Sequence, residues 1–96
     1  MPELSLLSPV DVQQNLADYL QKMRKASKLS REALAQKSAV PASTIKKFES
    51  TGQISLRQFI LLWQTLDELE RLNGLSSTPV ERPQSIEDVL RDNEGG

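Results

Sequence analysis

Residues 29–49 have the sequence LSREALAQKSAVPASTIKKFE, which predicts two short helices separated by a tight turn. Ser30 is a good N-cap for a helix over residues 31–38, because its hydroxyl can accept a hydrogen bond from a backbone N–H of the first turn. Proline disfavours helical geometry in the residue before it, so the chain should be extended just before Pro41. A second helix is expected from Ala42 to about Ser50. The apolar side chains that should point inward from the two helices are Leu34, Ala35, Ile45 and Phe48.

This stretch resembles the helix-turn-helix of the lambda-repressor/Cro (XRE) family, whose usual form is roughly L-T-Q-x-x-L-A-x-x-x-G-V-S-x-x-T-I-x-x-x-E. The resemblance extends through Gly52 and the apolar helix after it, and it covers roughly residues 12–74. It implies an all-α fold, namely a five-helix lambda-repressor-like DNA-binding domain whose second helix of the pair enters the major groove. The partners that it implies are double-stranded DNA with a palindromic operator and a second copy of the chain, as a homodimer.

Three positions depart from the family's pattern. Ala39 stands where the family prefers glycine, at a turn position that often needs a positive φ, which costs a residue with a side chain about 1 kcal/mol. Pro41 stands at the cap of the second helix, where Ser or Thr usually accepts backbone N–H bonds. Arg31 replaces a glutamine near a phosphate, and arginine there should keep that contact and add charge.

Carried over position by position, the resemblance places Ala42, Ser43 and Lys47 at base-reading sites, and Thr44 and Lys46 at sites near phosphate or flanking bases. The helical spacing agrees, because Ser43 and Lys47 are four residues apart and share a face. Lys47 can donate to guanine, whereas Ala42 offers only a methyl group to thymine. The alternatives are that the two lysines are merely solvated and that Ser43 and Thr44 only cap the helix.

Charge is distributed unevenly along the chain, although the net charge is only -1. Residues 22–47 carry eight Lys or Arg against Glu32 alone, whereas residues 67–96 carry eight Asp or Glu against three Arg. This asymmetry indicates a half that faces a polyanion and an acidic tail, or else two solvated faces of opposite sign. Further phosphate contacts are expected in the basic half, with an ordinary polar face as the alternative, at Arg31, Lys37 and Lys28.

Capping signals and periodicity place the remaining helices. A first helix should begin after Ser8, with Asp11 at the capping-box position, and fade near residues 26–28. Ser55 and Gln58 should open a fourth helix. A short fifth helix is expected over residues 68–73, ended by Gly74. One apolar face of the first helix is formed by Val12, Leu16, Leu20 and Met23, and the fourth helix carries Leu56, Phe59, Ile60 and Trp63.

These elements suggest three regions: an N-terminal arm over residues 1–7, the helix-turn-helix domain over residues 8–74, and a flexible acidic tail over residues 75–96. The last two helices carry more apolar surface than one small core needs, which favours a two-fold dimer contact. The alternative is that all of it is core. Trp63 is interpreted as core rather than as a platform for bases. The expected dimer residues are Leu62, Leu66, Leu69 and Leu72.

Composition excludes several classes of function. The chain of 96 residues has no Cys and no His, so it cannot build a Cys nucleophile, a Cys–His zinc site, a Ser-His-Asp triad or a disulfide framework. No paired arrangement suggests a reaction, no acidic loop has EF-hand spacing, and neither a cofactor nor a metal is expected. No apolar run is long enough to span a membrane, and residues 1–7 lack the basic region of a signal peptide, so a cytoplasmic, nucleoid-associated location is expected.

The expected function is that of a sequence-specific DNA-binding repressor without enzymatic activity. The size, the leading leucines and the tail resemble the small helix-turn-helix antitoxins of type II toxin–antitoxin systems, including HipB-like ones, which bind a toxin and repress their own operon. In the tail, Ile86, Val89 and Leu90 could fold onto a partner, or the tail could merely solubilise the protein. Two other possibilities are a stand-alone XRE-type repressor without a toxin and a helical protein-interaction adaptor that no longer binds DNA.

Overall fold

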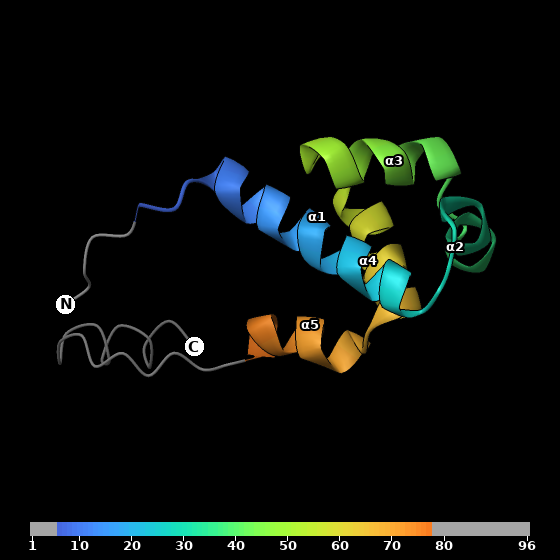
Figure 1. The fold of residues 1–96 in the computed structure, drawn as a ribbon. Coiled ribbons are helices and arrows are strands. Elements are labelled where there is room, and N and C mark those ends of the chain that lie inside the picture. The colour runs from blue at the N-terminus through green and yellow to red at the C-terminus, as the bar shows by residue number, and fades with distance from the viewer. Residues whose placement is uncertain (1–5, 78–96) are drawn as a thin grey trace, which may run out of the picture.

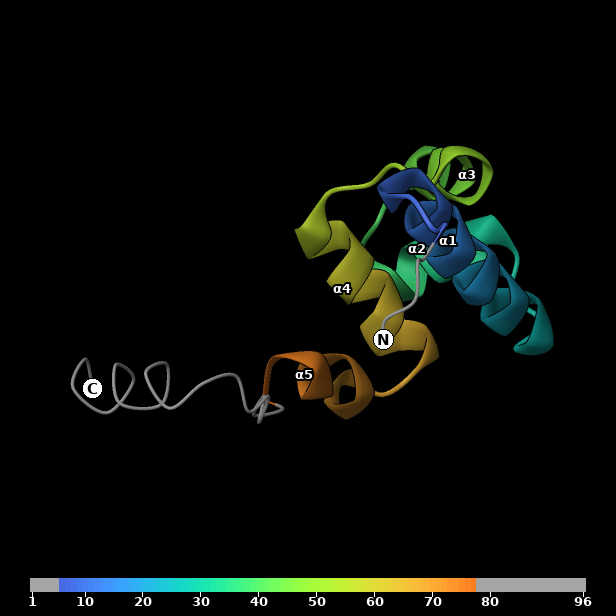
Figure 2. The same cartoon turned by 90° about the vertical axis from the view of Figure 1, so that its left-hand side faces the viewer.

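Five α-helices make up the regular structure of residues 6–77, the part of the chain that the computed structural model describes (Figure 1). In chain order they are α1 (Pro9–Ala26), α2 (Arg31–Ser38), α3 (Ala42–Thr51), α4 (Leu56–Leu66) and α5 (Leu69–Ser77). No strand occurs in this range, which confirms the all-α class. Figures 1 and 2 show α1 and α4 running in the same general direction, with α3 on one side of α1 and α5 turned back on the other.

Side-chain caps begin α1, α2 and α4 as the sequence predicts. Ser8 and Asp11 form a capping box at the start of α1, because each side chain accepts a hydrogen bond from the other residue's backbone N–H. The hydroxyl of Ser30 accepts from a backbone N–H of α2, and that of Ser55 accepts from the N–H of Gln58 in α4. These bonds satisfy donors that the helix itself leaves without a partner, and each is worth about 1 kcal/mol.

The turn between α2 and α3 has the geometry expected from the two residues, Ala39 and Pro41, that depart from the family's pattern there. Ala39 ends α2 in the left-handed region with φ of 66°, which confirms that a side chain occupies a position suited to glycine. Val40 is then completely buried. Pro41 precedes α3 with φ of -59° and ψ of 145°, and no side chain caps α3. The turn is therefore held by the burial of Val40 and by the hydroxyl of Ser38, which accepts a hydrogen bond from the backbone N–H of Val40 at 3.2 Å.

The core is one apolar cluster to which α1, α2, α3 and α4 all contribute. Aromatic rings contact one another within it: Phe48 and Phe59 pack edge to face, and Phe59 and Trp63 pack at a tilt, each pair with ring centroids 5.9 Å apart. Trp63 is buried and its indole N–H donates to the carbonyl of Glu68, which confirms it as a core residue. The buried apolar residues are Ala17, Leu20, Leu34, Val40, Ile45, Phe48, Phe59, Leu62, Trp63 and Leu66.

The inward face of α1 differs from the one that the apolar periodicity indicates. Val12 and Leu16 are exposed, and the buried stripe runs instead through Ala17, Leu20 and Arg24. Arg24 can occupy this inward stripe because its charge is paired with the buried carboxylate of Glu49 in α3. Leu56 is likewise exposed rather than buried.

The end of the helical domain also lies further along the chain than expected. Gly74 does not stop α5, which continues to Ser77, so residues 75–77 belong to the domain and not to a linker. A glycine inside a helix lowers its stability without ending it, because the backbone can still adopt helical angles. The rest of the expected tail, with Ile86, Val89 and Leu90, lies outside the described residues, as do residues 1–5 of the expected arm.

Candidate nucleic-acid interface

The outer face of α3 carries the side chains that the sequence assigns to base reading. Ile45 and Phe48 point into the core, which turns the opposite face of the helix outward. Ser43 and Lys47 are exposed on that face, as is Lys46 beside them. The two remaining assigned residues, Ala42 and Thr44, are half-buried. The structure therefore brings the expected base-reading and flanking residues of α3 to one accessible surface.

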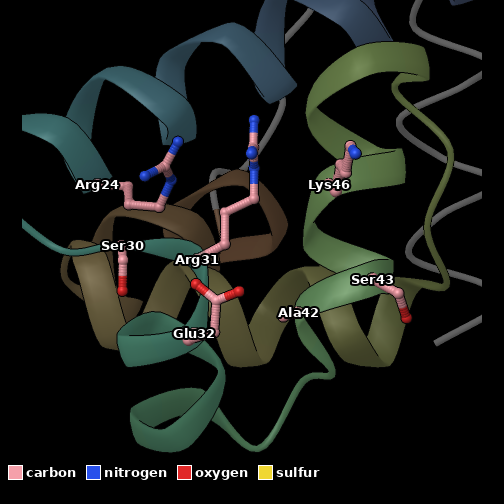
Figure 3. A pocket seen from close by; sticks show the side chains of 7 residues that line it. All are labelled: Arg24, Ser30, Arg31, Glu32, Ala42, Ser43 and Lys46. Carbon is pink, nitrogen blue, oxygen red and sulfur yellow. The ribbon is translucent and has the colours of Figure 1, made fainter.

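A groove opens between the first turns of α2 and α3 (Figure 3). Arg31 reaches into it from α2 and Lys46 from α3, and the exposed carboxylate of Glu32 lies on the same wall. Both helix N-termini meet here, so their positive dipole ends add to the two cationic side chains. The full lining consists of Arg24, Ser30, Arg31, Glu32, Ala42, Ser43 and Lys46.

A second groove lies on the other side of the N-terminal half of α3, toward the start of α4. Its lining includes both Ser43 and Lys47 together with Gln53 and Gln58. Glutamine amides donate and accept hydrogen bonds, so these two residues suit contacts with phosphates or base edges. Neither glutamine is among the site residues predicted from the sequence. The sequence signal near them was the capping motif of Ser55 and Gln58, which marks where α4 begins.

The carboxylate of Glu49 organises the buried side of this surface. Arg24 donates to it from Nε at 2.7 Å and from Nη2 at 3.1 Å, Arg31 donates from Nε at 2.9 Å, and Gln21 donates at 3.2 Å. Burial raises the pKa of Glu49, but the hydrogen bonds and charges of the two arginines outweigh it and hold that pKa below its ordinary value. Glu49 is therefore ionised at neutral pH and ties α1, α2 and α3 together.

Arg31 and Arg24 consequently differ in what they can contact. The ion pair with Glu49 uses Nε of Arg31, whose side chain keeps 37 % of its surface exposed beside Lys46. Arg24 has only 8 % of its side chain exposed and also donates to the carbonyl of Leu29, so it is a structural residue. Of these two arginines, Arg24 stabilises the fold, whereas Arg31 remains accessible at the surface.

Two of the expected phosphate contacts lie apart from the grooves. Lys28 follows α1 in the left-handed conformation with φ of 60°, and Lys37 lies in the last turn of α2. Both are exposed, but neither lines the groove between α2 and α3 or the one between α3 and α4. The structure does not bring them together with the exposed face of α3.

The expected dimer residues are not one surface. Leu62 is 1 % exposed and Leu66 8 %, so both belong to the chain's own core and cannot meet a partner; their assignment to a dimer contact is wrong. Leu69 is 37 % exposed and Leu72 half-buried, so these two remain accessible on α5. The reason is the direction of α4, whose Leu62 and Leu66 point to the core that α4 shares with α1 and α2.

Residues 6–77 contain neither a cluster of metal ligands nor a helix that could span a membrane. No group of three or more acidic, His or Cys side chains gathers in a way that could hold a metal ion. No helix there is both long and apolar enough to cross a membrane. The same residues hold ten Lys or Arg and seven Asp or Glu, so the described domain is net basic. Comparison with protein-family models, with curated proteins and with solved structures finds no match to this chain.

Proposed function

We propose that the protein is a sequence-specific DNA-binding transcriptional regulator that inserts the N-terminal half of α3 into the major groove. The observation that carries this proposal is the placement of Ser43 and Lys47 on one exposed face of that half, between two polar grooves. A lysine there can donate to guanine O6 or N7, and a serine hydroxyl can donate to or accept from either base edge. The resemblance of residues 29–49 to the XRE helix-turn-helix supports the same role.

The surroundings of these two residues suit the DNA backbone on either side. In the first groove, Arg31 is held by Glu49 through Nε, and its side chain stays partly exposed in the groove that Lys46 also lines. An arginine held in this way loses less side-chain entropy when its terminal amino groups bind phosphate. Because no side chain caps α3, the backbone N–H groups of its first turn remain open to a phosphate oxygen. In the second groove, Gln53 and Gln58 supply neutral donors. The missing side-chain cap, which weakens α3, thus supports anion binding at its first turn.

A protein-interaction adaptor is the second candidate, because Glu32 lies in the first groove and opposes phosphate there. Its single charge faces Arg31 and Lys46, which leaves the local balance positive and favours DNA. Within the DNA-binding proposal, an antitoxin that represses its own operon and a stand-alone repressor are two biological settings. A kinase-like or nuclease toxin encoded beside the gene would separate them.

The proposal is tested with the full chain and two neighbouring substitutions. Duplexes selected from a random library should yield a preferred sequence, and Lys47→Ala should cost about 1–3 kcal/mol and relax one base position. Lys46→Ala, a matched exposed lysine on the same helix, should weaken binding about equally to all sequences and reduce the salt slope by about 1. If no sequence is enriched, or if the two variants behave alike, α3 does not read bases and the adaptor role is favoured.

A further inference from the structure

An apolar hollow lies open between α4 and α5. It has a volume of about 380 Å³ and is lined by Ile60 of α4 together with Leu69, Glu70 and Asn73 of α5. Leu69 and Asn73 are four residues apart and therefore share a face of the helix. No residue of α5 is buried, and Leu69 is 37 % exposed. Residues 6–77 thus leave this face partly uncovered, so it can take up further apolar side chains.

A polar cluster fixes α5 in the position that forms this hollow. The hydroxyl of Tyr19 in α1 donates to the carboxylate of Asp67, and Arg71 donates to both groups. The guanidinium of Arg71 also lies 5.5 Å from the ring centre of Trp63, whose indole N–H donates to the carbonyl of Glu68. These contacts hold the start of α5 where the helix turns back beneath α1 (Figure 1). The hollow is therefore preformed in the fold.

The sequence beyond α5 contains one apolar group with helical spacing. Val89 and Leu90 follow Ile86 by three and four residues, so the three side chains share one face of a helix. Ser85 and Asp88 have the spacing of a capping box at the start of such a helix. The charged residues of the segment fall outside this face, and they are Glu87, Asp88, Arg91 and Asp92. A helix over residues 86–92 would therefore be amphipathic, with a narrow apolar face.

We propose that residues 86–92 of the same chain fold as a short helix and place its three apolar side chains in the hollow between α4 and α5. The connection from α5 to this segment consists of residues 78–85, which can span up to about 26 Å when extended. The rise of α5 from Leu69 to Ser77 is only about 12 Å. The segment can therefore turn back along α5, antiparallel to it, and reach the hollow without strain.

Size and attachment favour the chain's own segment over a separate protein as the occupant. Four residues line the hollow, whereas a stable interface between separate proteins involves about 20–30 residues on each side. The connection of eight residues makes the contact intramolecular, with an effective concentration on the order of millimolar, so that a small apolar contact can suffice. The antiparallel direction also brings Arg91 toward the end of the hollow where Glu70 lies, and unlike charges then meet. None of these arguments depends on DNA binding.

The test uses pairs of introduced cysteines in the full chain, which has no cysteine of its own. Asn73→Cys lies in the hollow, whereas Leu75→Cys replaces a side chain that is 80 % exposed and lies about 200° further around α5. Each is combined with Val89→Cys, and helical circular dichroism checks that both variants fold. In a glutathione redox buffer with dilute protein, the pair with Asn73→Cys should form its intramolecular disulfide at least about tenfold more readily than the pair with Leu75→Cys. Random collision predicts no such preference, because Leu75 is nearer to Val89 along the chain.

Two further substitutions test the apolar contact itself. Adding Ile86→Asp and Leu90→Asp to both cysteine pairs should abolish the preference for Asn73→Cys, because the apolar face is then lost. Equal disulfide formation by the two original pairs would show that the segment meets α5 only by random collision, and would overturn the inference. Disulfides formed mainly between two chains would assign the hollow to a second copy instead. A preference that survives both aspartates would show that the apolar face is not what docks.

Discussion

Replacing Glu49 by glutamine should remove a large part of the domain's stability. The side chain is 4 % exposed and accepts hydrogen bonds from Arg24, Arg31 and Gln21. Glutamine keeps the size and one acceptor but removes the charge, so Arg24 is left buried without a counter-ion. Breaking a buried ion pair by removing one partner costs about 3–5 kcal/mol. The free energy of unfolding of a domain with 72 described residues is about 4–11 kcal/mol, so the variant should be only marginally stable.

The assay is urea unfolding followed by helical circular dichroism, with Glu32→Gln as the matched control. Glu32 undergoes the same chemical change on the surface, so its effect should stay within about 0.5 kcal/mol. A loss of 3 kcal/mol lowers the Tm of a domain this size by about 12 °C or more. A cost below about 1 kcal/mol for Glu49→Gln, with an unchanged m-value, would refute the view that the ion pair with Arg24 holds α1 and α3 together.

Four further outcomes follow from the same structure. Ala39→Gly should stabilise the domain by about 0.5–1 kcal/mol in urea unfolding, because φ of 66° suits glycine; a loss would show that the turn is unstrained. Gly52→Ala should destabilise the domain by about 1–3 kcal/mol, since φ is 78° and a Cβ would lie 3.0 Å from Gln13. Gly74→Ala should instead stabilise it by about 0.5–1 kcal/mol, because a Cβ there meets no neighbouring atom within 4 Å; equal effects of the two substitutions would contradict both expectations. The pKa of Glu49 is lowered in the fold, so its contribution to folding stability is complete above the unfolded pKa near 4.3 and is lost as the pH falls through the folded pKa. Thermal melts of Glu49→Gln at a series of pH values should therefore show a smaller loss of stability at acid pH than the wild-type chain shows. If a dimer contacts about eight phosphates, the logarithm of the DNA affinity should fall with the logarithm of the salt concentration at a slope near -7, and a slope near zero would exclude phosphate contacts.

The local signals in the sequence identified the helices because each signal acts within a few residues. Ser8, Ser30 and Ser55 cap helices in the structure through bonds that span three residues. The positive φ of Ala39 was expected from the resemblance, because the family prefers glycine at this turn position. Gly74 misled because a glycine weakens a helix without obliging it to end, and α5 continues through it to Ser77.

The features that could not be predicted from the sequence depend on contacts between residues far apart in the chain. The burial of Arg24 depends on Glu49, 25 positions later, so a charged residue occupies the inward stripe of α1 where periodicity favoured Leu16. The same limit applies to the expected dimer residues. Apolar spacing marked Leu62 and Leu69 alike, but only the packing of α4 decides that Leu62 belongs to the core. The exposed face of α3 could be predicted from the sequence, because Ile45 and Phe48 fix which side of the helix faces inward.

The Glu49 carboxylate joins stability to the proposed DNA contact through one group. Arg24 alone would neutralise it, yet Arg31 also donates to it from the groove between α2 and α3. An arginine held by Nε loses less side-chain entropy when its terminal amino groups meet a phosphate, so affinity gains from an interaction already made in the free protein. The phosphate then competes only weakly with Glu49, because the carboxylate keeps both bonds from Arg24. Replacement of the usual glutamine by Arg31 is therefore consistent with a fold that supplies it a buried anchor.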